Sequence, residues 1–122
     1  MKLVIVENGK PARTILERPD LILAPQWSAD GKQLVTGVGS FSSFLDFEVG
    51  SRKPVDPANG GAQVAIVHDD GSGFKLLTAG PNNNGFPSFA PDGRRIIYRT
   101  AGPEGQGLRI LSLADGSVTK LT

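Results

Sequence analysis

Two segments of the chain, Pro25–Val35 (PQWSADGKQLV) and Pro87–Ile97 (PSFAPDGRRII), share one pattern. Each has proline, any residue, an aromatic, a small residue, any residue, Asp-Gly, a basic residue, a polar residue and two aliphatic residues. The Asp-Gly pair predicts a tight turn, because Asp hydrogen-bonds nearby backbone N–H groups and Gly accepts a left-handed conformation. We expect Trp27 and Phe89 to start short inner strands before these turns. Repeated units of this kind indicate an architecture of stacked modules.

Short β-branched stretches lie between the turns. The 122 residues include 16 glycines and nine prolines, which break helices and punctuate loops. Asn8-Gly9, Asp70-Gly71 and Asp115-Gly116 predict hairpin turns. No window has convincing helical periodicity, so the pattern predicts an all-β sandwich, barrel or propeller. The expected strands are Lys2–Glu7, Ala12–Glu17, Gln33–Thr36, Gln63–His68, Phe74–Thr78, Arg95–Thr100, Leu108–Leu113 and Val118–Thr122.

The composition excludes several classes of protein. With no cysteine and a single histidine, His68, the chain can form neither a disulfide framework nor a thiolate or His-rich metal site. A net charge of +1 gives no footprint for nucleic acid or an anionic membrane, so we expect neither as a partner. The longest stretch free of Gly and Pro, Ser40–Val49, is far shorter than the about 20 residues of a transmembrane helix. The apolar start, Met1–Glu7, is soon interrupted by Asn8-Gly9, so we expect no signal peptide.

The repeats resemble the WD40-like (PD40) repeats of TolB-like β-propellers. The segments WSADGKQLV and FAPDGRRII are each followed by a hairpin that ends in Leu-Thr, at Leu77-Thr78 and Leu121-Thr122. Ala29 replaces the usual proline of this repeat, and Ala90 replaces the usual serine. The resemblance implies blades that are antiparallel four-stranded meanders. Such repeats occur in periplasmic interaction proteins, in prolyl-oligopeptidase-like peptidases and in a sugar-acid lyase.

The chain length corresponds to about two and a half blades. A blade takes about 40–45 residues, and closed propellers have about 4–8 blades. We expect a single partial propeller domain over 1–122, with a half blade at 1–17, a blade at 21–78 and a blade at 86–122. The chain would then be a fragment of a longer propeller. Alternatively, its open sheet edges pair with another protomer or a partner, because exposed edges favour association.

A long insertion at 37–61 separates two strands of the middle blade. It contains Phe41, Phe44 and Phe47, half of the six phenylalanines in the chain. Loops longer than about 12–15 residues are usually functional or disordered. We interpret these aromatic residues as a candidate binding loop for a protein or ligand. The loop could instead pack onto the blade, extend the two flanking strands as a hairpin, or form a helical turn at Ser42–Glu48.

A second candidate surface is the link between the two blades, Pro81–Gly85. In propellers such links lie at one rim of the central channel, so Asn82, Asn83 and Asn84 are candidate binding residues. A plain turn rich in Asn and Gly is the alternative. The residues that we assign to the structural repeat motif are Trp27, Asp30, Gly31, Phe89, Asp92, Gly93, Asp115 and Gly116.

The chain contains no recognisable catalytic motif. It has no Gly-x-Ser-x-Gly elbow, and His68 has no second histidine to act with. Asp69–Gly73 lacks the alternating ligands of an EF-hand, and the spacing of Asp46, Glu48 and Asp56 supports no acid–base pair. We therefore expect a non-enzymatic protein- or ligand-binding module without cofactor or metal. The alternative is the propeller portion of a peptidase or lyase whose catalytic residues lie elsewhere. A TolB-like parent would be periplasmic or secreted.

Overall fold

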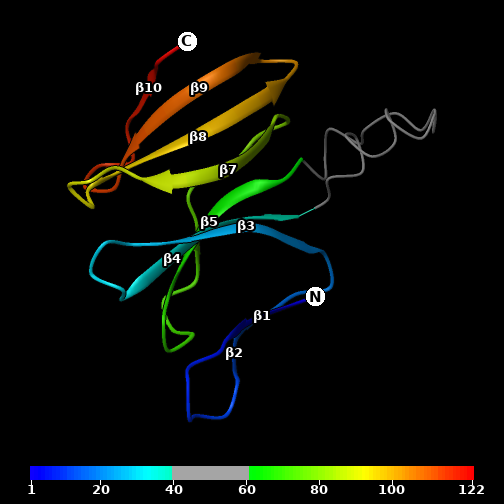
Figure 1. Cartoon of the computed structure of the whole chain (residues 1–122). Coiled ribbons are helices and arrows are strands. Elements are labelled where there is room, and N and C mark those ends of the chain that lie inside the picture. The colour runs from blue at the N-terminus through cyan, green and yellow to red at the C-terminus, as the bar shows by residue number, and fades with distance from the viewer. Residues whose placement is uncertain (40–60) are drawn as a thin grey trace.

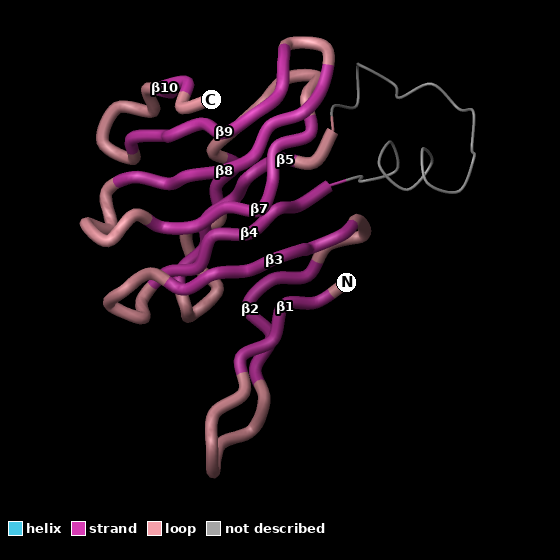
Figure 2. Tube along the Cα trace, turned by 45° about the horizontal axis from the view of Figure 1, so that its top comes forward, coloured by secondary structure: helices cyan, strands magenta, loops and turns pink. Residues whose placement is uncertain are grey.

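The computed structural model of the protein describes residues 1–39 and 61–122. All regular elements of this part are strands, and they form three antiparallel sheets (Figures 1 and 2). Sheet A has two strands and sheets B and C have four each, with the strands of B and C joined in chain order. Sheet A contains β1 (Lys2–Ile5) and β2 (Arg13–Glu17); sheet B contains β3 (Leu21–Trp27), β4 (Gln33–Gly39), β5 (Gln63–His68) and β6 (Lys75–Leu76); sheet C contains β7 (Asn83–Phe89), β8 (Arg95–Gly102), β9 (Gly105–Ser112) and β10 (Val118–Lys120). The predicted all-β fold of about two and a half meander blades is confirmed.

The Asp-Gly turns have the same local structure in both repeats. The carboxylate of Asp30 accepts hydrogen bonds from the hydroxyl of Ser28 at 2.6 Å and from the backbone N–H of Lys32 at 3.0 Å. Gly31 follows with a φ of 71°, a conformation that glycine adopts without steric cost. In sheet C, Asp92 and Gly93 repeat the turn, with a φ of 68° at the glycine. Each turn joins the first two strands of a blade.

The two aromatic repeat residues end their strands, so the prediction that they start them is wrong. Trp27 is the last residue of β3 and Phe89 is the last residue of β7. Each strand begins six residues earlier and has an irregular register just before a proline. Ala24 and Phe86 precede these prolines with φ values of 54° and 51°. Such a bulge interrupts the alternation of side chains along the strand, so the sequence pattern does not predict the first half of the strand.

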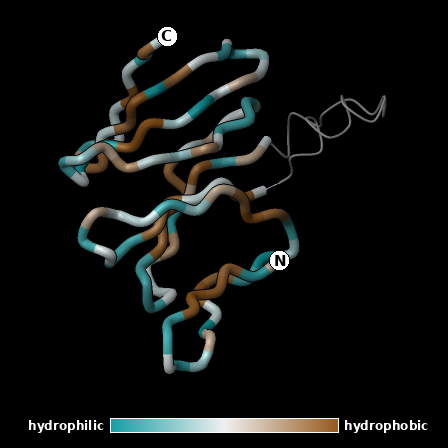
Figure 3. The backbone as a smooth tube through the Cα atoms, in the orientation of Figure 1, coloured by the Kyte–Doolittle hydropathy of each residue, from teal (hydrophilic) through white to brown (hydrophobic). Residues whose placement is uncertain are grey.

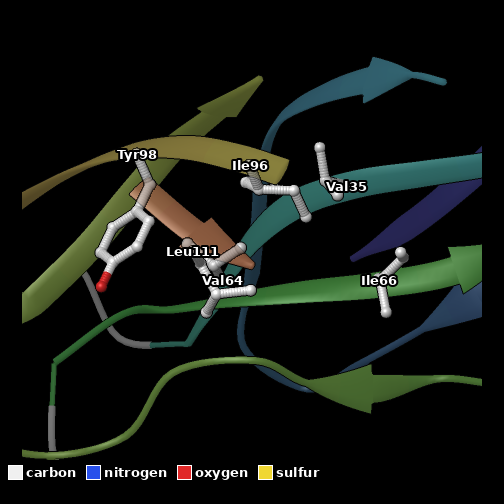
Figure 4. Packing of buried hydrophobic residues seen from close by; sticks show 6 residues of the cluster. All are labelled: Val35, Val64, Ile66, Ile96, Tyr98 and Leu111. Atoms are coloured by element: carbon white, nitrogen blue, oxygen red, sulfur yellow. The ribbon is translucent and has the colours of Figure 1, made fainter. Parts of the chain in front are cut away.

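Sheets B and C pack face to face through one apolar cluster (Figure 4). Its buried members are Val35, Val64 and Ile66 from sheet B with Ile96, Tyr98 and Leu111 from sheet C. Partly buried Leu77, Phe89 and Leu113 pack against this cluster. Burial of an aliphatic side chain of this size stabilises a fold by about 1.5–3 kcal/mol. The cluster therefore holds the two blades together as stacked units.

Sheet A covers the other face of sheet B. Ile5 and Ile15 cluster with Leu34 and Val67 of sheet B, and a neighbouring cluster is formed by Ile22, Val38 and Ala65. Figure 3 shows the apolar stretches of the β1–β2 hairpin near sheet B. Sheet B is thus packed between two sheets, which explains why β4 and β5 are buried along most of their length.

The structure describes only the two ends of the insertion, 37–39 and 61. β4 continues through Gly37–Gly39, at the beginning of the segment expected as a loop. Phe41, Phe44 and Phe47 lie outside the described residues, as do the carboxylates of the insertion, Asp46, Glu48 and Asp56. Within the described residues, no helix is sufficiently long and apolar to pass through a membrane.

Candidate binding site

A polar depression of about 260 Å³ lies where the end of sheet B meets sheet C. The residues that follow β6 form one wall, and the strands of sheet C with the β8–β9 turn form the other. Its polar and charged side chains are mostly held by backbone that belongs to strands, which fixes their positions. The lining residues are Leu77, Thr78, Ala79, Asn82, Asn84, Tyr98, Thr100, Glu104, Arg109 and Val118.

Asn82 lines this depression and is only 6% exposed. Its side-chain amide donates hydrogen bonds to the hydroxyl of Thr100 at 3.0 Å and to the carbonyl of Gly105 at 3.2 Å. Its side-chain oxygen accepts the backbone N–H of Glu104 at 3.0 Å. Asn82 therefore fixes the β8–β9 turn, and its own hydrogen-bonding groups are occupied.

Gln63, the first residue of β5, connects the two blades at the same place. Its side-chain oxygen accepts hydrogen bonds from the hydroxyl of Thr78 at 2.6 Å and the amide of Asn84 at 2.9 Å. Its amide nitrogen donates to the carbonyl of Gly80 at 3.0 Å. Asn83, beside Asn84, accepts the backbone N–H of Ala62 with its side chain at 2.9 Å. Asn83 and Asn84, two of the candidate binding residues, thus belong to β7, and Asn82 directly precedes it. All three side chains take part in a hydrogen-bonded junction.

Tyr98 and two charged residues complete the wall on sheet C. The Tyr98 side chain is almost entirely buried, and Figure 4 shows its hydroxyl turned away from the aliphatic cluster. Burial raises the pKa of Tyr98, and the nearby positive charge of Arg109 acts in the opposite direction. Arg109 donates hydrogen bonds from one guanidinium nitrogen to the carbonyls of Leu108 at 2.9 Å and Thr122 at 3.0 Å. These groups suit polar contacts with a small ligand or peptide backbone.

The remaining candidates are dispersed over the described residues. Trp27 is 48% exposed, whereas Phe89, at the equivalent position, is partly buried against the cluster between sheets B and C. His68 is exposed at the end of β5. Asp70 is engaged in the β5–β6 turn, where its carboxylate accepts the N–H and hydroxyl of Ser72. In the described ranges, no three His, Cys, Asp or Glu side chains lie together as a metal site.

An exposed aromatic residue lies on the edge of sheet C. β7 is the edge strand of this sheet and contacts β3, the first strand of sheet B. Phe86 on β7 is 60% exposed and has a φ of 51°, while the following Pro87 is fully buried. Leu23 on β3 is also exposed, at 37%. The alternation of apolar and polar residues in the sequence gives no indication that Phe86 is exposed, because the bulge at Phe86 interrupts this alternation.

The comparisons with known proteins find similarity to TolB proteins. No family model matches the chain. The chain is 42% identical over 64 residues to the Tol-Pal system protein TolB of Thioalkalivibrio sulfidiphilus, a match over 52% of this chain and 14% of that protein. The crystal structure of TolB from Acinetobacter baumannii superposes on 94% of this chain with a TM-score of 0.67 and 21% identity, and the match covers 24% of that chain. The chain thus spans a quarter or less of these relatives.

Proposed function

Because the chain carries TolB-like β-propeller blades, we propose that it is a non-enzymatic protein-binding module within a longer propeller. In this proposal 1–17 is a half blade, and 21–78 and 86–122 are blades that stack with further blades. The match to small fractions of two TolB chains supports this organisation. The exposed Phe86 on the edge of sheet C is the observation that favours a binding role.

Phe86 combines exposure with an unfavourable backbone. A bulky residue at positive φ costs about 1–3 kcal/mol, and such residues cluster at active sites, ligand clamps and switch regions. The bulge itself belongs to the repeat, because Ala24 has nearly the same φ in sheet B. A phenylalanine side chain that is 60% exposed gains little from packing at this position. We therefore assign it to contact with a partner.

We propose that the partner is a protein of a Tol-Pal-like system and that the compartment is the periplasm. The named system of the T. sulfidiphilus relative supports this choice. Phe86 would contact the partner, and we propose Phe41, Phe44 and Phe47 of the insertion as further binding residues on the basis of the sequence. Asn82 and Asn84 would shape the depression where sheet B meets sheet C, with Tyr98 and Arg109 available for polar contacts. Asn83, between them in the chain, is a further candidate binding residue.

Binding can be measured by calorimetric titration of the purified chain with the other Tol-Pal proteins of its own organism. We expect saturable binding that Phe86→Ala weakens by about tenfold or more, because an aromatic residue at the centre of an interface often contributes above 1 kcal/mol. The matched control is Leu108→Ala, which removes an exposed side chain on β9 and should leave the affinity unchanged. Absence of binding, or equal affinity of the Phe86→Ala protein, would contradict the proposal.

A further inference from the structure

The polar depression between sheets B and C contains a hydroxyl group that the chain itself does not use. The Tyr98 side chain lines this depression and is only 5% exposed. Its hydroxyl, turned away from the aliphatic cluster in Figure 4, makes no hydrogen bond within the described residues. No side-chain polar atom that is fully sealed from solvent is left unpaired in this part of the chain. The Tyr98 hydroxyl therefore opens onto the depression, where a ligand can reach it.

Two opposite charges line the same depression. Arg109 pairs with Tyr98 across β8 and β9, so both side chains leave sheet C on the same face. Its Nη1 is bonded to two backbone carbonyls, whereas its Nη2 lies toward the β8–β9 turn, 3.7 Å from where a Cβ on Gly105 would be. Glu104 belongs to this turn, and its Oε2 lies 3.8 Å from where a Cβ on Gly80 would be. Among the described residues, the carboxylate of Glu104 forms no ion pair with Arg109 or with another side chain.

Apolar side chains complete the lining of the depression. Leu77, Ala79 and Val118 lie beside the polar groups. The volume of about 260 Å³ is below the roughly 300–1,000 Å³ of pockets that enclose drug-sized ligands. The turn that contributes Glu104 is held in place, because the side-chain oxygen of Asn82 accepts its backbone N–H. The depression therefore suits a small molecule that combines an apolar group with polar ones.

The two charges restrict the chemistry of that molecule. A plain anion would be repelled by Glu104, and a plain cation would be repelled by Arg109. A carboxylate can accept hydrogen bonds from a guanidinium and from a neutral phenol. Burial raises the pKa of Tyr98, so its hydroxyl keeps the proton that it donates. An ammonium group can donate to the carboxylate of Glu104. A ligand with both groups, a zwitterion, matches the whole set.

We propose that this depression binds a free α-amino acid with an aliphatic side chain. Arg109 and the Tyr98 hydroxyl hold the carboxylate of the ligand, and Glu104 holds its ammonium group. The apolar part of the lining contacts the aliphatic side chain. The inference goes beyond the proposed function, because it requires neither Phe86 nor a protein partner.

The test uses L-leucine as the probe and two analogues that each lack one charge. The full chain, labelled with nitrogen-15, is titrated while the backbone amide signals of Gly80, Glu104 and Gly105 are followed. L-Leucine should shift these signals saturably. L-Leucinamide lacks the carboxylate and should bind about tenfold or more weakly, because charge-assisted hydrogen bonds to a buried group are lost. N-Acetyl-L-leucine lacks the ammonium group and should bind about two- to fivefold more weakly, since Glu104 is exposed.

Two substitutions assign the ligand groups to residues. Glu104→Gln keeps the backbone N–H that Asn82 binds; it should weaken L-leucine binding by about two- to fivefold and leave N-acetyl-L-leucine unaffected. Tyr98→Phe keeps the ring in the core and should weaken L-leucine binding by about tenfold. Its melting temperature should stay unchanged, because no hydrogen bond within the described residues is lost. The matched control is Glu17→Gln, the same change of charge on β2 of sheet A, which should leave the affinity unchanged.

Several outcomes would overturn the proposal. The first is the absence of saturable shifts with L-leucine, and the second is equal binding of L-leucinamide. Equal losses with Glu104→Gln and Glu17→Gln would also overturn it. N-Acetyl-L-leucine binding as tightly as L-leucine would overturn it in favour of a peptide C-terminus, which has no ammonium group next to its carboxylate. Phe86→Ala should bind L-leucine as the parent does, so this proposal and the proposed function can fail separately.

Discussion

Replacing Asn82 by alanine tests whether the buried amide holds the blade junction or serves a ligand. The substitution removes three hydrogen bonds, which involve Thr100, Gly105 and Glu104. Thr100 is only 4% exposed, so its hydroxyl loses a partner that water replaces poorly, at a cost of about 1–3 kcal/mol. Gly105 and Glu104 are exposed, so their backbone groups can bond to water at about 0.5 kcal/mol each. We expect Asn82→Ala to lower the free energy of unfolding by about 2–4 kcal/mol.

Urea unfolding, followed by circular dichroism and Trp27 fluorescence, measures this loss. A loss of this size should also lower the melting temperature by roughly 10–20 °C for a domain of about 100 residues. Asn82→Asp keeps the acceptor for Glu104 but cannot donate to Thr100, so it should also be destabilised. Glu104→Ala is the matched control, because it keeps the backbone N–H and should change stability by less than about 0.5 kcal/mol. An Asn82→Ala protein as stable as the parent would refute the structural role.

Three further predictions concern the turns and the core. Gly31→Ala should lower the free energy of unfolding by about 1–2 kcal/mol in a urea titration, because φ is 71° although no atom lies near the added Cβ; no loss would contradict the turn geometry. Ile96→Ala should lower the free energy of unfolding by about 2–5 kcal/mol, since the side chain is fully buried between the blades. A loss no larger than that caused by Leu108→Ala would argue against the apolar cluster between sheets B and C. Hydrogen bonds lower the pKa of Asp30, Asp70, Asp92 and Asp115 below the ordinary value near 4. The stabilisation that these carboxylates provide is therefore present above about pH 4 and lost as the pH falls through their folded pKa values. The urea midpoint of unfolding should drop between pH 5 and pH 2. A midpoint that stays constant over this range would contradict the prediction.

Much of the fold is predictable from the sequence because the turn chemistry is local. Asp-Gly at 30–31 and 92–93 determines its own backbone conformation, and the aliphatic pairs that follow enter strands as expected. The repeat then indicates the meander, because each unit has the same order of turns and strands. The start of β3 and β7 was not predictable in this way, since a bulge before Pro25 and Pro87 disrupts the alternation.

The candidate site was less accessible to sequence analysis. The sequence indicates Asn82 and Asn84 as candidate binding residues, but in the structure their amides are buried and hydrogen-bonded within the chain. For Tyr98 and Gln63 the sequence predicts only a place in a strand, because the alternation of side chains assigns a residue to a face of the sheet and does not say what lies opposite that face. Their meeting depends on how sheets B and C pack, which is a non-local property. The different exposure of Trp27 and Phe89 likewise depends on the neighbouring sheet and leaves no local signal.

The most direct test of the account is whether the two blades stack through the cluster of Figure 4. In a sample with labelled Ile, Leu and Val methyl groups, nuclear Overhauser contacts report which side chains adjoin in solution. The account predicts contacts from Val35 and Val64 of sheet B to Ile96 and Leu111 of sheet C. Contacts within each sheet without any between these two pairs would contradict it, because the sheets would then be folded but not stacked.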